Sequence, residues 1–175
     1  HSYSSAASDV YKRQETLETG TKSAALGGIV GIFEMPNTNP LTVTPEAMDF
    51  KLKRASETAY VDYAFYFGGT AENSSNLSEW ENLKGVCGIK IFMGSSTGSL
   101  LSATDEEIDK IFANGKRVIA VHAEDEAMMN ENKITILKDS NDVKMHNIWR
   151  SEESCFNATK RVVSIAKKYN RPVHV

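Results

Sequence analysis

Two apolar stretches decide the fold: residues Val86–Met93 are VCGIKIFM and residues Val118–His122 are VIAVH. Strands that are apolar on both faces have to be buried on both, which is typical of parallel sheets covered by helices. Helix signals separate the two stretches, because Thr104 and Glu107 form a capping box before an amphipathic segment that Asn114-Gly115 closes. Strands that alternate with helices in this way predict an α/β protein with a parallel sheet.

The same alternation continues on both sides of these two strands. Thr44-Pro45 is a typical helix start, and Lys167 and Lys168 suit the last turn of a long helix. The polar stretch Asn130–Trp149 predicts a loop or a short helical excursion. The other predicted strands are Ile29–Met35, Val61–Phe67 and Pro172–Val175, and the other predicted helices are Glu15–Leu26, residues 44–58 and Ser151–Tyr169.

Two architectures share this pattern, an open doubly wound sheet and a closed (β/α)₈ barrel. The sequence contains neither the dinucleotide fingerprint GxGxxG nor the phosphate-binding loop GxxxxGK[ST]. The segment Gly94–Gly98, GSSTG, could resemble a phosphate cradle, but no lysine follows it. A loop after a strand is therefore the favoured interpretation of this segment.

Composition excludes several classes of protein. The chain has 175 residues, a formal net charge of −3 and 41% hydrophobic residues, which argues against a disordered chain and against a basic nucleic-acid-binding domain. No apolar run approaches the roughly 18 residues of a membrane helix. Cys87 and Cys155 form no disulfide framework, so we expect a cytoplasmic protein.

Residues 1–14 differ in composition from the rest of the chain and are predicted to be a non-native segment. Residues 15–175 are predicted to be a partial domain.

Lys90 is the first candidate site residue. Ile89 and Ile91 share one parity in the strand, and Lys90 and Phe92 share the other. A buried lysine is costly unless it is paired, neutral or modified, and its lowered pKa makes the amine available for covalent chemistry. A lysine that extends its amine to solvent at the strand end is an equally good interpretation.

His122 ends the next strand, and Asn37 lies in the turn MPNTNP of Met35–Pro40. A neutral imidazole binds zinc well, and the carboxylates of Glu124 and Asp125 could orient it, although a lone histidine is more often part of a core. The Asn37 amide could bind a ligand or close an Asx turn. His146 and His174 are weaker candidates.

Taken together, EMPNTNP, GIKIFMGSSTG, VIAVHAEDE and the terminal RPVHV resemble dihydroorotases of the amidohydrolase superfamily. The resemblance runs from about Glu15 to the end of the chain. It implies an incomplete (β/α)₈ TIM barrel, approximately strands two to six, with one or two zinc ions at the carboxyl ends of the strands. It also implies that Lys90 and His122 are metal ligands, with Lys90 as a bridging N6-carboxylysine, and that Asn37 binds the substrate.

The implied reaction is the reversible hydrolysis of dihydroorotate to N-carbamoyl-L-aspartate in pyrimidine biosynthesis. The resemblance implies a small-molecule substrate, no nucleic acid or membrane partner, and a parent protein that forms a homo-oligomer or associates with another pyrimidine-pathway enzyme. The family's HxH motif, its sixth-strand histidine ligand and its catalytic aspartate have no counterpart in this sequence. No catalytic residue is therefore assigned, and we expect the chain alone to be inactive.

Three alternatives remain open on the sequence alone. A hydantoinase or allantoinase would share the cyclic-amide chemistry, whereas a non-catalytic amidohydrolase-like scaffold would support a partner enzyme. A flavodoxin-like binding domain would have an open sheet in which Lys90 and His122 do not converge.

Overall fold

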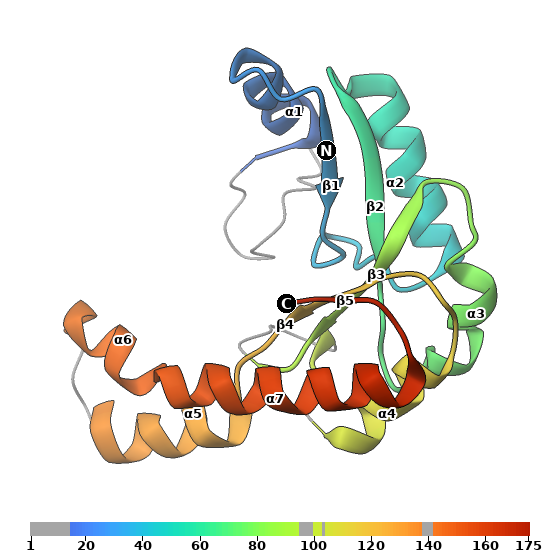
Figure 1. Ribbon diagram of the computed structural model, residues 1–175. Coiled ribbons are helices and arrows are strands. Elements are labelled where there is room, and N and C mark those ends of the chain that lie inside the picture. The colour runs from blue at the N-terminus through green and yellow to red at the C-terminus, as the bar shows by residue number, and fades with distance from the viewer. Residues whose placement is uncertain (1–14, 95–99, 103, 138–141) are drawn as a thin grey trace.

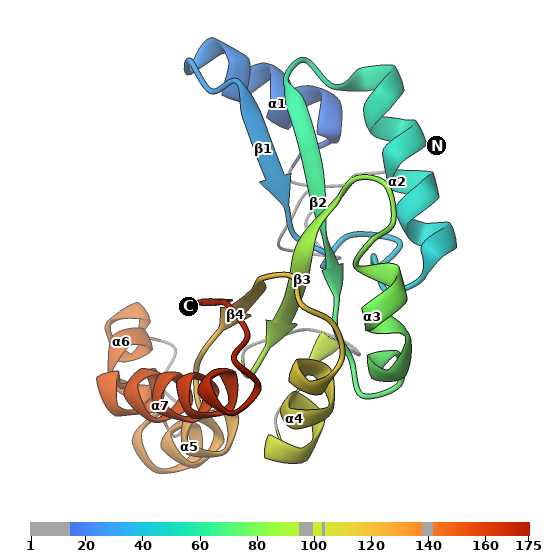
Figure 2. The same cartoon turned by 45° about the vertical axis from the view of Figure 1, so that its right-hand side comes forward.

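The computed structural model describes residues 15–94, 100–102, 104–137 and 142–175. Their strands form one curved, entirely parallel sheet, with helices along its outer side (Figures 1 and 2). The strands are β1 (Gly31–Glu34), β2 (Asp62–Gly68), β3 (Val86–Phe92), β4 (Ile119–His122) and β5 (Val173–His174).

Two helices begin at the caps that the sequence predicts, and a third begins at a cap that the structure shows. The Thr44 side chain caps α2, Thr104 and Glu107 form the capping box of α4, and Ser151 caps α7. The longer helices are α1 (Leu17–Leu26), α2 (Pro45–Thr58), α4 (Asp105–Ala113) and α7 (Glu152–Tyr169). The shorter helical elements are η1 (Ser74–Asn76), α3 (Leu77–Trp80), α5 (Glu126–Asn132), η3 (Lys133–Leu137), η4 (Val143–Met145) and α6 (His146–Trp149).

The strand order distinguishes the two architectures. It is β1-β2-β3-β4-β5, so each strand pairs with the next one in sequence. A doubly wound sheet reverses its order at a switch point, whereas a barrel adds each new strand on the same side. The flavodoxin-like alternative is therefore wrong, and the predicted α/β class with barrel-type topology is confirmed.

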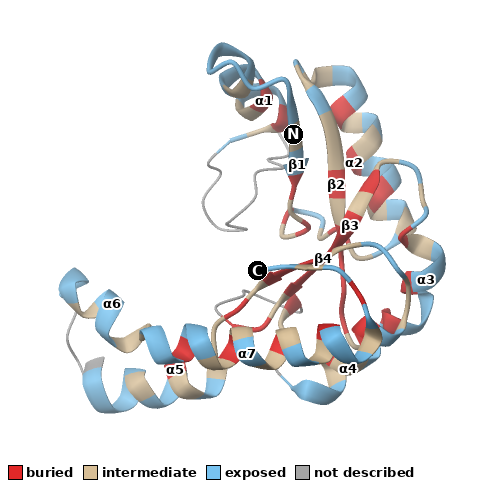
Figure 3. Cartoon of the chain, in the orientation of Figure 1, coloured by how far each residue is buried: buried red, intermediate tan, exposed pale blue. Residues whose placement is uncertain are grey.

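The core lies between the outer face of the sheet and the helices. Phe65 and Phe67 on β2 and Ile89 and Ile91 on β3 are fully buried there. Figure 3 shows the buried residues concentrated on the central strands and on the helix faces that cover them. The predicted separation of Ile89 and Ile91 from Lys90 is thus correct, and the structure assigns the faces: Ile89 and Ile91 pack among the helices, and Lys90 lies on the inner face.

The first strand is shorter and more exposed than predicted. It covers four residues, and the side chains of Val30 and Phe33 are 84% and 67% exposed. The predicted burial of Ile29–Met35 on both faces is wrong for these residues, because β1 is an edge strand of the described sheet. Exposed apolar side chains beside unpaired backbone groups are what an uncovered strand edge presents.

One buried ion pair joins β1 to the helical layer. Lys51 of α2 lies 3.0 Å from the carboxylate of Glu34 and donates a hydrogen bond to the Met35 carbonyl at 3.1 Å. Burial raises the pKa of Glu34 and lowers the pKa of Lys51. The pair fixes the end of β1 just before the turn that contains Asn37.

Candidate metal centre

The register of β3 and β4 brings Lys90 and His122 onto one face. Lys90 pairs with Ala120, and Phe92 pairs with His122. Paired residues of neighbouring parallel strands share a face, so both candidate ligands lie on the inner face near the carboxyl ends of their strands. Phe92 lies between them, with its ring centroid 4.9 Å from the Lys90 amine and 6.4 Å from the imidazole centroid.

Lys90 is buried without a carboxylate partner in the described part of the chain. The residue is 8% exposed, and its amine lies over the Phe92 ring. Burial lowers the pKa of Lys90 to about 8. An amine with this pKa is partly neutral near physiological pH, and the neutral amine is the form that reacts with CO₂.

We expect the uptake of CO₂ by Lys90 in the metal-free protein to increase as the pH rises through about 8. Below that pH the amine is protonated and cannot attack, and above it the neutral form dominates. An ordinary exposed lysine, with a pKa of about 10.4, should need a much higher pH. ¹³C-bicarbonate labelling at several pH values measures this, with Lys90→Arg as the control. A carbamate signal that is unchanged in Lys90→Arg would contradict the assignment.

His122 is held by a carboxylate two residues further along the chain. Its Nε2 lies 2.6 Å from Oε2 of Glu124. An ionised carboxylate only accepts hydrogen bonds, so Nε2 donates the proton. In a neutral imidazole this leaves the lone pair on Nδ1, which has no hydrogen-bond partner among the described residues. A histidine that gives one ring N–H to a carboxylate and keeps the other nitrogen free has the form of a metal ligand.

Glu124 has a second partner, Arg150, from the end of the polar stretch before α7. The Arg150 Nε donates to Oε1 at 2.9 Å, and a terminal nitrogen of the same guanidinium bonds to Oε2. Burial alone would raise the pKa of Glu124, but the hydrogen bonds from Arg150 and His122 lower it overall. The carboxylate therefore stays ionised and available as an acceptor for His122.

Asn37 lies in a turn that is tied to the end of β2. The backbone of Thr42 accepts a hydrogen bond from Gly68 at 2.8 Å, and the Asn73 side chain bonds to the carbonyls of Val43 and Gly68. The Asn37 Oδ1 is buried and has no hydrogen-bond partner among the described residues. A buried, unsatisfied amide oxygen is uncommon and is consistent with a role in binding a ligand.

Gly94 allows the segment after β3 to approach the segment after β4. A Cβ at this position would lie 2.6 Å from the Glu124 carbonyl oxygen and 2.8 Å from Met129 Cε. The first residue of the predicted GSSTG loop thus has a packing role, while residues 95–99 lie outside the described part of the chain.

We expect Gly94→Ala to lower the free energy of unfolding by about 1–3 kcal/mol, the usual cost of overpacking. The contact is with backbone, which cannot rotate away as a flexible side chain would. Gly31→Ala is a matched control, because its Cβ would meet its nearest neighbour at an ordinary 3.6 Å. Urea denaturation of both variants measures the difference. Equal stabilities for the two variants would show that the segment simply shifts.

The other histidines do not join this group. His174 pairs with Ala120 and so shares the inner face, but it is exposed on the edge strand β5. His146 packs against Trp149, with ring centroids 5.7 Å apart. Among the described residues, no group of three or more His, Cys, Asp or Glu side chains could hold a metal. The candidate group is therefore Lys90 and His122, which share the inner face of neighbouring strands.

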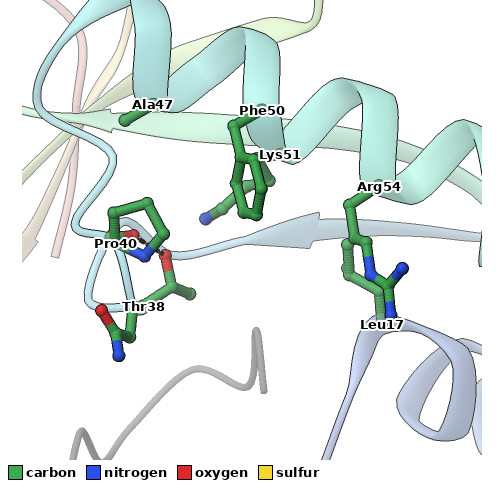
Figure 4. Close-up of a pocket in the computed structure, with 8 residues that line it drawn as sticks. Leu17, Thr38, Pro40, Ala47, Phe50, Lys51 and Arg54 are labelled. Carbon is green, nitrogen blue, oxygen red and sulfur yellow. Dashed lines mark hydrogen bonds between the residues drawn. The ribbon is translucent and has the colours of Figure 1, made fainter. Parts of the chain in front are cut away.

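A small pocket lies beside the Asn37 turn but does not include Lys90 or His122. Figure 4 shows Phe50 and Lys51 of α2 near the turn at Thr38 and Pro40, and Arg54 beside Leu17 of α1. Within the turn, the Thr38 hydroxyl donates to the Pro40 carbonyl at 2.8 Å. Its lining is mainly apolar and lies between α1, α2 and the turn. We assign no ligand to this pocket.

A family model described as dihydro-orotase-like matches residues 6–141 of the chain. The chain belongs to this family. The match covers β1 to β4 and includes Asn37, Lys90 and His122. It begins within residues 1–14, so the predicted boundary at residue 15 remains a prediction.

Curated relatives include three kinds of cyclic-amide enzyme. The dihydroorotase of Thermococcus kodakarensis is 31% identical over 94% of this chain and 34% of its own length. The L-hydantoinase of Paenarthrobacter aurescens is 37% identical over 69% of the chain and 27% of its own length. The allantoinase of Arabidopsis thaliana is 38% identical over 63% of the chain and 23% of its own length.

Among solved structures, the L-hydantoinase (dihydropyrimidinase) from Arthrobacter aurescens superimposes with a TM-score of 0.81 at 29% identity. The superposition covers 91% of this chain and 37% of that one. The chain thus spans 23–37% of the length of these relatives. No helix in the described part of the chain is long and apolar enough to cross a membrane.

The two candidate ligands, Lys90 and His122, are chemically suited to bind a metal ion. Lys90 offers a buried amine with no competing carboxylate among the described residues, and His122 offers an imidazole whose far nitrogen already has an acceptor. Sequence reasoning identified both residues and suggested Glu124 as an orienting carboxylate. It missed Arg150, which lies 26 residues from Glu124 in a stretch that gave no functional signal.

Proposed function

We propose that this chain is part of a zinc-dependent cyclic amidohydrolase, a dihydroorotase that interconverts dihydroorotate and N-carbamoyl-L-aspartate in the cytoplasm. The observation that carries the proposal is that Lys90 on β3 and His122 on the neighbouring strand β4 share the inner face of the sheet, within a dihydro-orotase-like sequence match. Dihydroorotase is preferred because its matches extend over more than nine-tenths of the chain, the Asn37 turn included.

Lys90, as a carboxylated lysine, and His122, through Nδ1, would hold the metal. Bound zinc would lower the pKa of a water molecule and polarise the amide carbonyl. The buried Lys90 amine would supply an anionic oxygen ligand once it had reacted with CO₂, because a carbamate carries the charge of a carboxylate. Glu124 would keep the His122 imidazole in one orientation.

Asn37 would bind the substrate carboxylate. A carboxylate only accepts hydrogen bonds, so Nδ2 of the Asn37 amide would make this contact, and the buried Oδ1 would accept from an N–H of the substrate. The turn that contains it is fixed to β2 and, through Lys51 and the Met35 carbonyl, to α2. We assign no general acid or base within these 175 residues, and we expect the chain alone not to hydrolyse dihydroorotate.

A hydantoinase or allantoinase is the second candidate, because relatives of both kinds share higher identity over shorter segments. The deciding experiment uses the protein from the complete reading frame that contains this chain. Its metal content is measured, and its turnover is compared on dihydroorotate, hydantoin and allantoin. Hydrolysis of hydantoin or allantoin without dihydroorotate would overturn the first proposal. A metal-free protein that is inactive on all three would favour the non-catalytic scaffold.

A further inference from the structure

In the described part of the connection between β4 and α7, the end of α5 contacts Trp149, the residue before Arg150. The Asn132 side chain, at the end of α5, donates a hydrogen bond to the Trp149 carbonyl at 3.0 Å. The Lys133 amine lies 4.6 Å from the centroid of the Trp149 ring, and the Arg150 guanidinium lies 5.5 Å from it. The segments on the two sides of this connection are therefore held together around Trp149.

This closure places Arg150 against the carboxylate that holds His122. Two nitrogens of the guanidinium bond to the two oxygens of Glu124, which is a fork-to-fork arrangement. The Glu124 side chain is 13% exposed and that of Arg150 is 24% exposed, whereas the His122 side chain is 39% exposed. The carboxylate is thus enclosed by its two partners, while the imidazole keeps an open side.

We propose that Arg150 is a positioning residue for the metal centre: it fixes Glu124 so that His122 keeps its proton on Nε2 and presents Nδ1 to the metal. The metal-binding half of this inference rests on the proposed function. The half that concerns the imidazole does not, because the hydrogen bonds are made by this chain's own residues. The connection between β4 and α7 thus places the Arg150 guanidinium near the carboxyl end of β4.

The geometry explains why an arginine is suited to this position. A carboxylate held by one partner can rotate about its terminal bond, and the acceptor for His122 would then move. Two parallel N–H···O bonds remove that rotation, which a single lysine amine cannot do in the same way. Lysine at this position should therefore preserve the charge without preserving the orientation.

The test uses the protein from the complete reading frame, with Arg150→Ala and Arg150→Lys as variants. Arg54→Ala is the matched control, because this arginine on α2 makes a looser ion pair with Glu57 at 3.9 Å. The first readout is the ¹⁵N spectrum of histidine-labelled, metal-free protein, with His122 assigned by its loss in His122→Asn. The second is Co²⁺ affinity by chelator competition, together with the Co²⁺ visible spectrum.

We expect His122 to be an Nε2–H tautomer in the wild type and in Arg54→Ala, and to become a tautomer mixture in Arg150→Ala. Co²⁺ affinity should fall about 10- to 100-fold in Arg150→Ala, the usual effect of removing an outer partner of a metal ligand. Arg150→Lys should retain only part of the wild-type Co²⁺ affinity, and added guanidinium should restore the Co²⁺ affinity of Arg150→Ala. That rescue also distinguishes lost positioning from lost folding.

Unchanged tautomer and Co²⁺ affinity in Arg150→Ala would overturn the inference, even if the wild type hydrolyses dihydroorotate. Full recovery by Arg150→Lys would also overturn it, since charge alone would then suffice. If the wild type hydrolyses no cyclic amide, but the single His122 tautomer of the wild type is lost in Arg150→Ala, the positioning role stands and only the proposed function fails.

Discussion

Arg171→Met is expected to lower the free energy of unfolding by about 3–5 kcal/mol, the usual cost of removing one partner from a buried ion pair. The Arg171 and Glu81 side chains are 1% and 4% exposed, with 2.8 Å between the guanidinium and the carboxylate. The guanidinium also donates to carbonyls at the end of α4 and to the Arg117 carbonyl. Glu81 accepts further hydrogen bonds from the backbone of Lys116 and Arg117.

The variant would leave the Glu81 charge buried without its cationic partner, and the carbonyls without their donor. Urea denaturation followed by the fluorescence of the two tryptophans measures the loss, and Trp80 directly precedes Glu81. Lys168→Met is the control, because its 2.6 Å ion pair with Asp109 joins α7 to α4 but is exposed. An exposed pair contributes little, so this variant should remain close to wild type. Equal losses in the two variants would contradict the assigned role of burial.

The central strands could be predicted because a strand that is buried on both faces consists almost entirely of apolar residues. The strands predicted at Val61–Phe67, Val86–Met93 and Val118–His122 match β2, β3 and β4 to within one residue at each end. Predicting β1 as buried was wrong, since apolar composition indicates that a strand is covered but not which neighbour covers it. The short helix α3 was not predicted, because four residues carry no periodic signal.

The candidate site could be predicted in part for the same reason. Parity within β3 separated Lys90 from Ile89 and Ile91 without deciding which face is the core, and the end of β4 placed His122 after an apolar run. The register between the two strands, which brings the residues to one face, is a property of the folded sheet. Arg150 and Glu124 are 26 residues apart, and their contact depends on how the intervening chain folds. No local sequence pattern predicts such a contact.

Under the proposed function, Lys90→Ala is expected to abolish hydrolysis of dihydroorotate by the protein from the complete reading frame, with a loss of at least about 10³-fold. A loss of this size is comparable to the rate contribution of one essential electrostatic group in an active site. The reason is specific to the environment of Lys90, which is buried beside Phe92 and has no carboxylate partner among the described residues. If Lys90 becomes a carbamate, its removal takes an anionic oxygen ligand from the site.

Two companion variants separate this role from simple packing. Lys90→Arg keeps a positive charge and similar length but cannot form a carbamate, so it should be as inactive as Lys90→Ala. Lys51→Met removes a second buried lysine, which is already paired with Glu34, and should reduce stability more than turnover per folded molecule. Metal content and turnover are measured for all three variants.

A short carboxylate such as acetate should restore part of the activity of Lys90→Ala, because it offers two oxygens and the charge of the missing carbamate. It should not rescue Lys90→Arg, whose side chain still fills the space next to Phe92. Retention of wild-type metal content and turnover by Lys90→Arg would show that Lys90 serves only as a cation. The shared inner face of Lys90 and His122 would then be a feature of the sheet and not of a metal centre.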